Sequence, residues 1–161
     1  AERITDIEED SGGADLAFYW AAGYPYSSLS SRTEDSMGIK FLALADVRIT
    51  GARCKSTWAN AVDYRLAFWA DDGTTLLASA TVAGDGETAT YKDFALLSAL
   101  ELDALTEYYV TLERMDNANM VKYYGPHVDH AFFRRTASFS GMPTSQDSAS
   151  DTYAIMIQGE I

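Results

Sequence analysis

The chain has 161 residues, of which 47% are hydrophobic and 22% charged, values that suit one folded domain with a sizeable core. Its 24 acidic residues outnumber its 12 basic ones, and the net charge of −12 would repel both a nucleic-acid backbone and an anionic lipid surface. No apolar run reaches the length of a transmembrane helix, and the first residues lack the pattern of a signal peptide. We therefore expect neither nucleic-acid binding nor membrane insertion.

Short runs of alternating hydrophobicity begin near the N-terminus and predict strands. The first three lie at Leu16 to Trp20, Ser36 to Leu44 and Asp46 to Lys55. Gly51 interrupts the third run, where a β-bulge would change which side chains face the core.

The next two runs predict a β-hairpin. Residues 62–70 alternate strictly, and the run from Leu76 to Val82 repeats the pattern after Asp71-Asp72-Gly73-Thr74. That tetrapeptide is a strong turn signal because Gly tolerates positive φ and Asp bonds its own backbone.

Further strands are expected at Thr88 to Leu96, at Glu107 to Met115 and in a closing segment from Tyr153 to Ile157. The segment from Leu96 to Leu105 has helical spacing, so it forms either a short helix or a strand end with a loop whose leucines cap the core. We favour the strand and loop.

Three stretches, 23–35, 116–130 and 140–151, are expected to be long loops. Turn signals every 8–12 residues, with no helices alternating with the strands, predict an all-β fold: a two-sheet antiparallel sandwich of jelly-roll type. The expected organisation is an N-terminal arm with the first strand at 1–35, followed by the sandwich domain at 36–161.

Several segments stand in a recognisable order: Gly38-Ile39-Lys40-Phe41, Ile49-Thr50-Gly51-Ala52-Arg53, Leu66-Ala67-Phe68-Trp69 with Asp72-Gly73-Thr74 and Leu77-Ala78-Ser79-Ala80-Thr81-Val82, and Leu102-Asp103-Ala104-Leu105-Thr106-Glu107-Tyr108-Tyr109-Val110. Together they resemble a family of small jelly-roll modules of unknown function that occur in bacterial secreted enzymes and surface proteins. Leu105 departs from the pattern, which usually has Gly there, and Tyr91 stands where Trp is common. The resemblance spans about residues 37–115 and implies a fold more than a function.

Catalytic and metal-binding patterns are sparse. His127-Val128-Asp129-His130 could contribute metal ligands but lacks an identified third side chain, and loop residues without a metal are the simpler interpretation. The single cysteine, Cys54, is more typical of a core residue than of a nucleophile. No nucleophile elbow, P-loop or dinucleotide motif occurs, so we expect no enzyme activity, no metal and no cofactor. Hard oxygen ligands in turns leave calcium open, although ordinary turn chemistry also accounts for Asp71, Asp72, Asp116, Asn117 and Asn119.

Aromatic residues are abundant, and they divide into two groups. Phe41, Tyr64, Phe68 and Tyr108 alternate into the expected core. A second group lies in expected loops or on the opposite face, where it would either bind a partner or sugar rings, or cover a second small core. From this group we select Trp58, Tyr123, Tyr124 and Phe132 as candidate ligand-binding residues; its other members are Tyr24, Tyr26, Trp69 and Phe133.

Two functions remain open at this point. The first is a non-enzymatic assembly or surface structural protein, most simply a virion decoration or tail component at a virion or extracellular surface. Its partner would be another protein of the assembly or further copies of the chain, held through the terminal segments. The alternative is a carbohydrate-binding module that uses the loop aromatics.

Overall fold

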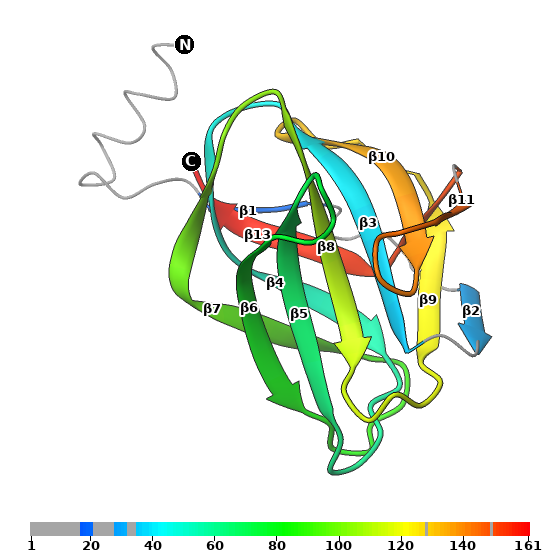
Figure 1. The fold of residues 1–161 in the computed structure, drawn as a ribbon. Helices are drawn as coiled ribbons and strands as arrows, with labels where there is room; N and C mark the ends of the chain where they lie inside the picture. The colour runs from blue at the N-terminus through cyan, green and yellow to red at the C-terminus, as the bar shows by residue number, and fades with distance from the viewer. Residues whose placement is uncertain (1–16, 21–27, 32–34, 128, 149) are drawn as a thin grey trace.

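Every regular element among the residues that the structure describes is a β-strand. This computed structural model describes residues 17–20, 28–31, 35–127, 129–148 and 150–161. Their strands form two antiparallel sheets packed face to face (Figure 1). The predicted all-β, jelly-roll-like sandwich is therefore confirmed. The described residues include no helix with the length and apolar character needed to span a membrane.

The two sheets are named here after their central strands. The β4 sheet has the order β1 (Ala17–Tyr19), β13 (Ile155–Glu160), β4 (Val47–Ser56), β9 (Val121–Pro126) and β12 (Asp151–Tyr153), with β2 (Ser28–Ser31) paired to β9 and β7 (Thr90–Leu102) paired to β4. The β8 sheet has the order β11 (Gln146–Ser148), β10 (Phe133–Ser140), β3 (Ser36–Ala43), β8 (Thr106–Arg114), β5 (Asp63–Ala70) and β6 (Leu76–Ala83).

The core lies between the inner faces of the two sheets. Alternation places one side chain in two on that face, so Ile39 and Phe41 of β3 meet Ile155 and Ile157 of β13 in one buried cluster. The aromatics predicted to point inward, Phe41, Tyr64, Phe68 and Tyr108, are all buried, as expected.

The predicted hairpin forms as β5 and β6, which pair from Asp63 with Ala83 to Trp69 with Leu76. Its turn is held by the Asp72 carboxylate, which accepts hydrogen bonds from the backbone N–H groups of Thr74 and Thr75 at 2.8 Å each. Gly73 has φ +70°, the left-handed conformation that the turn signal predicted.

The predicted bulge at Gly51 is also present. The pairing of β4 with β7 shifts register between Ile49 and Gly51, and the pairing with β13 shifts opposite the same place. A Cβ on Gly51 would lie 2.0 Å from the carbonyl oxygen of Phe94, so the two strands approach too closely for any other residue.

The ambiguous segment from Leu96 is a strand and not a helix. β7 continues to Leu102, and a turn then leads through Leu105 into β8. Leu102 is buried, but Leu97 is fully exposed and Leu105 is 77% exposed, so these two leucines do not cap the core as expected.

The segments expected to be long loops contain strands instead. β2 lies in 23–35, β9 in 116–130 and β11 in 140–151, while β10 follows directly after Phe132. Pairing with neighbouring strands satisfies backbone groups that a loop would have to expose to water.

The N-terminal segment joins the sandwich where it is described. β1 pairs with β13, and β2 pairs with β9, so both belong to the β4 sheet. Residues 1–16, 21–27 and 32–34 of the expected arm, which include Tyr24 and Tyr26, lie outside the described residues, and the division into arm and domain stays a prediction.

Candidate binding surfaces

The sequence places Trp58 among exposed aromatics, and this expectation is wrong. Trp58 follows β4 and is completely buried. Its indole Nε1 donates a hydrogen bond to the carbonyl oxygen of Thr90 at 3.0 Å, and its ring packs against Tyr64 and Phe94. Burial removes the observation on which its selection as a ligand-binding residue depended.

The other three candidates do not share an exposed surface. Tyr123 is only 4% exposed, so its expected exposure is also wrong; it packs with Ala154 and Met156 on the outer face of the β4 sheet. Tyr124 and Phe132 are half-buried against the main core, with Phe132 beside Phe18 at 5.1 Å between ring centroids. Ligand binding by these residues stays a prediction.

Trp69 and Phe133 illustrate the other interpretation of the aromatics. Phe133 is fully buried in the main core. Trp69 belongs to a small second cluster with Ala67, Tyr109, Ala137 and Phe139, and its Nε1 donates to Thr111 Oγ1 at 2.9 Å. These side chains come from the strand positions that alternate away from the main core.

Both ring nitrogens of His127 contact other protein side chains. Its Nδ1 accepts a hydrogen bond from Arg135 Nε at 2.7 Å, and its Nε2 lies 2.6 Å from Asp129 Oδ1. His130 Nδ1 accepts from the backbone N–H of Phe132 at 3.3 Å. Across the described residues, no three His, Cys, Asp or Glu side chains gather as a metal site would require.

The oxygen ligands considered for calcium lie in two separate turns. β5 and β8 are antiparallel, with Ala70 opposite Tyr108 and Tyr64 opposite Arg114. The turn with Asp72 therefore lies at one end of this pair, and the turn with Asp116 lies at the other. The Asp116 carboxylate accepts hydrogen bonds from Arg114, which lower its pKa.

Cys54 is a core residue, with no exposed surface. Burial raises the pKa of its thiol far above the usual range, because the charged thiolate would lose its hydration. A thiol that stays protonated is a poor nucleophile at neutral pH.

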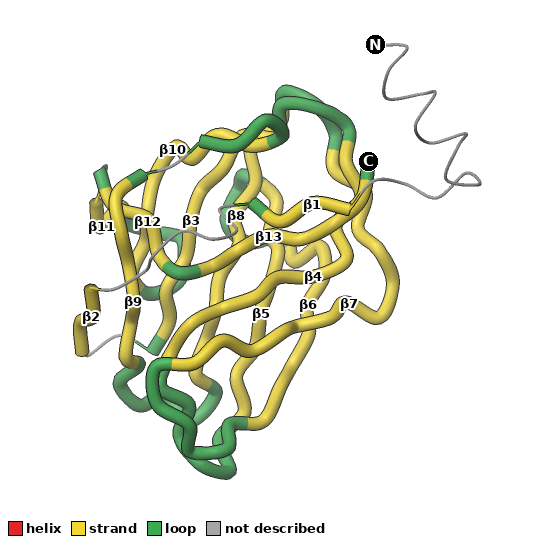
Figure 2. Tube along the Cα trace, turned by 180° about the vertical axis from the view of Figure 1, so that it is seen from behind, coloured by secondary structure: helices red, strands yellow, loops and turns green. Residues whose placement is uncertain are grey.

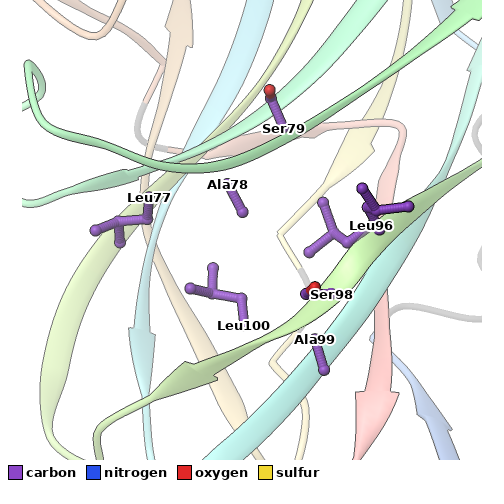
Figure 3. A pocket seen from close by; sticks show the side chains of 8 residues that line it. Leu77, Ala78, Ser79, Leu96, Ser98, Ala99 and Leu100 are labelled. Atoms are coloured by element: carbon purple, nitrogen blue, oxygen red, sulfur yellow. The ribbon is translucent and has the colours of Figure 1, made fainter.

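A groove of about 270 Å³ opens between β6 and β7, where the edges of the two sheets face each other (Figure 3). Among the described strands, β6 pairs with β5 alone and β7 with β4 alone. Figure 3 shows β6 side chains on one side of the groove and β7 side chains on the other. The lining is Leu77, Ala78, Ser79, Leu96, Leu97, Ser98, Ala99 and Leu100.

A bulge of four residues in β7 shapes this groove. Ala95 pairs with Gly51 and Leu100 pairs with Ile49, so the β7 residues 96–99 stand opposite the single residue Thr50. The extra length bows β7 outward and leaves Leu97 with no protein cover. A bulge in a strand rich in leucine also accounts for the helical spacing seen in the sequence.

The outer face of the β4 sheet carries a second arrangement, on the side that Figure 2 turns toward the viewer. Arg53 of β4 and Asp93 of β7 form two parallel hydrogen bonds, Nε to Oδ1 at 2.8 Å and Nη2 to Oδ2 at 3.0 Å. The Arg53 guanidinium lies 5.6 Å from the ring centre of Tyr19. Lys55 Nζ lies 5.6 Å from the ring centre of Tyr91 and contacts the buried Tyr123 beyond it.

Charge pairing holds this face in place. The hydrogen bonds that Arg53 donates to Asp93 raise the pKa of the Arg53 guanidinium and lower the pKa of the Asp93 carboxyl. Tyr19 and Tyr91 are 39% and 40% exposed, although large aromatics are usually buried. We name these four residues, Tyr19, Arg53, Tyr91 and Asp93, the tyrosine face.

The sequence contained a signal for the tyrosine face that the choice of loop aromatics missed. Phe18 and Trp20 are buried on either side of Tyr19, so alternation in the predicted strand places Tyr19 outward. Tyr91 is three residues from the buried Phe94 and therefore faces the other way in an extended strand.

Comparison with known proteins supports the fold and does not identify a family. Neither the protein-family models nor the curated proteins give a match. Among solved structures, the chain is similar to the clostridial cysteine protease Cwp84 after propeptide cleavage, with a TM-score of 0.55 and 12% sequence identity. The match covers 89% of this chain and 40% of the protease chain. At this identity the likeness shows a shared fold alone.

Proposed function

We propose that the chain is a non-enzymatic assembly or surface structural protein that docks a partner at the groove between β6 and β7. The observation that carries this proposal is the open pair of sheet edges at that groove, whose lining has no charged side chain. Edge strands of monomeric proteins are usually protected by charged side chains, proline or bulges. β6, from Leu76 to Ala83, has no charged residue and no proline, and Leu76 and Leu77 are exposed.

The occupant we propose is an extended segment of a partner protein that adds as a strand beside β6. Strand addition uses main-chain hydrogen bonds for affinity and places alternate side chains in pockets. The leucines of β6 and β7 favour apolar side chains at those alternate positions.

The charge around the groove favours basic residues at the ends of that segment. Between Asp71 and Asp103 the chain has seven acidic residues and one basic residue, Lys92, which pairs with Asp85 at 2.6 Å. A second copy of this chain, with a net charge of −12, is less complementary than a basic segment.

A place on the surface of a larger particle, such as a virion, is the setting we propose. A strongly negative outward surface keeps a particle soluble and free of self-association. We propose no enzyme activity, and the environments of the single cysteine and of His127 support this. Cys54 is buried, and both ring nitrogens of His127 are engaged by protein groups.

Binding of a labelled probe peptide tests the proposal. The probe alternates valine and threonine over five residues between two lysines at each end, and fluorescence anisotropy measures its dissociation constant. We expect Leu97→Lys, at a fully exposed position in the groove, to weaken binding about tenfold, which corresponds to about 1.4 kcal/mol. Met115→Lys, which adds the same charge at an exposed methionine outside the groove, is the matched control and should bind as the unchanged chain does.

Three outcomes contradict the proposal. The probe fails to bind the unchanged chain, Leu97→Lys binds it equally well, or a probe with glutamate in place of lysine binds more tightly. Light scattering adds a separate check of the occupant: a dimer that Leu97→Lys converts to a monomer would make a second copy, and not a basic partner segment, the occupant of the groove.

A further inference from the structure

The tyrosine face combines features that suit a ligand different from a peptide strand. Tyr19 of β1 and Tyr91 of β7 are partly exposed. Arg53 lies on β4, between the strands that carry them, and its partner Asp93 lies on β7 two residues after Tyr91. The strand order β1, β13, β4, β7 sets three strand spacings between the two tyrosine strands, about 14 Å. A surface of this width matches an extended chain of rings better than a single small molecule.

The polar centre of the face presents donors and acceptors side by side. A bidentate Arg–Asp pair uses two N–H groups of the guanidinium and one lone pair on each carboxylate oxygen. The Asp93 side chain is 53% exposed and that of Arg53 is 42% exposed, so the remaining N–H groups and lone pairs can reach solvent. Neighbouring hydroxyl groups, each both donor and acceptor, complement such an arrangement.

The charge of the face selects among ligands. Arg53 and Asp93 neutralise each other, which leaves Lys55 beside Tyr91 as the local positive charge. Because the whole chain carries −12, we expect the long-range field still to disfavour a phosphate, sulfate or carboxylate ligand. A neutral ligand rich in hydroxyl groups has no such cost. Aromatic rings also supply flat apolar surface with little loss of side-chain entropy on binding.

We propose that the tyrosine face binds neutral glycans, with Tyr19 and Tyr91 stacking on sugar rings and Arg53 and Asp93 bonding their hydroxyl groups. The pairing with Asp93 fixes the guanidinium, and Tyr19 supports it from one side, so the polar groups are held in position before the ligand arrives. This site is independent of the β6–β7 groove and uses none of its lining residues.

Isothermal titration with four neutral hexasaccharides tests this site: cellohexaose, mannohexaose, maltohexaose and chitohexaose. We expect at least one of them to bind the unchanged chain. Tyr91→Ala and Tyr19→Ala should each weaken that binding at least about fivefold, as truncation of a central aromatic contact does. Tyr91→Phe keeps the ring and should stay within about twofold of the unchanged chain. Circular dichroism checks that each variant is folded.

Leu97→Lys separates this site from the proposed function, because it alters the groove and leaves the tyrosine face unchanged. It should bind the hexasaccharide as the unchanged chain does, although its affinity for the probe peptide is lower. The inference is overturned if no hexasaccharide binds, if the alanine variants bind as well as the unchanged chain, or if a sulfated hexasaccharide binds more tightly than every neutral one. Any of these results leaves the peptide experiment at the groove unaffected.

Discussion

The ring of Trp58 stands edge-on to the ring of Tyr64, with 4.8 Å between the centroids and 82° between the planes. Trp58 also connects the end of β4 to the turn after β6. Its backbone N–H donates to the carbonyl oxygen of Glu87 at 2.8 Å, and its backbone carbonyl oxygen accepts from the N–H of Gly86 at 2.8 Å. The residue that the sequence suggested as a binding aromatic is therefore a packing element at one end of the sandwich.

Replacing this indole tests its structural role. We expect Trp58→Ala to lower the free energy of unfolding by about 3–5 kcal/mol, because the fully buried ring leaves a cavity and Thr90 loses its donor. Trp58→Phe should cost less. Urea denaturation followed by circular dichroism measures both, and Leu97→Ala, at a fully exposed leucine, should change stability by less than about 0.5 kcal/mol. A Trp58→Ala variant as stable as the unchanged chain would contradict this role.

Leu105 occupies a backbone conformation that suits glycine. Its φ is +59°, its N–H donates to the carbonyl oxygen of Ala43 at 2.7 Å, and its side chain is 77% exposed. The modules that the sequence resembles usually have Gly at this position.

We expect Leu105→Gly to raise the free energy of unfolding by about 0.5–1 kcal/mol. Relief of the left-handed strain, about 1–2 kcal/mol, outweighs the extra backbone entropy that Gly loses on folding. Leu105→Ala is the matched control: it keeps the Cβ that causes the strain and should gain nothing. Thermal and urea denaturation measure both variants, and equal stability of the Gly and Ala variants would show that φ at this position is not strained.

The ionisation of Asp72 makes the stability of the β5–β6 turn depend on pH. Three hydrogen bonds from Thr74 and Thr75 lower the pKa of its carboxyl from 3.8 to about 2. The pKa is lower in the folded state than in the unfolded state, so this contribution to stability is complete above about pH 5 and is lost as the pH falls toward 2.

The midpoint of thermal unfolding of Asp72→Ala, measured between pH 2 and pH 6, tests this linkage. The difference from the unchanged chain should be largest near pH 5 and shrink steadily toward pH 2. Asp72→Asn keeps an oxygen that can accept from the two backbone N–H groups, so its difference from the unchanged chain should disappear when Asp72 is protonated. A difference for Asp72→Ala that stays constant with pH would contradict the assignment.

Local chemistry made much of the fold predictable. The β5–β6 hairpin follows from strict alternation around a turn with Asp and Gly, and the bulge follows from a lone Gly in a strand. β9 and β10 were missed because their alternation is broken. Lys122 of β9 is fully buried and donates to Ser140, and the register of β10 shifts between Arg135 and Ala137.

The candidate surfaces were less predictable than the fold because they depend on tertiary position. Trp58 and Tyr91 are both aromatic residues near a strand end, yet the former is buried and the latter is 40% exposed. Which one reaches solvent depends on how strands far apart in sequence pair. The groove has a further cause that no local pattern reveals: the four-residue bulge of β7 arises only when β7 is paired with β4.

Gly51 offers the most direct test of that pairing. The Cβ of an alanine here would lie 2.0 Å from the carbonyl oxygen of Phe94 and 3.2 Å from the Cα of Ala95, and both atoms belong to the backbone of β7. Because a backbone cannot move aside as the end of a side chain can, we expect Gly51→Ala to lower the free energy of unfolding by about 1–3 kcal/mol. The displacement should also loosen β7 beside the groove, so amide hydrogen exchange should speed up for residues 94–100 more than for β8.

The matched control is Gly141→Ala, whose added Cβ meets no atom within 4 Å although its φ is +84°. The free energy of unfolding of that variant should fall only by the strain of a left-handed φ at a non-glycine residue, and hydrogen exchange in β7 should stay unchanged. If Gly51→Ala kept full stability and unchanged exchange in β7, the close approach of β4 and β7 at the bulge would be wrong. The shape of the β6–β7 groove would then need another explanation.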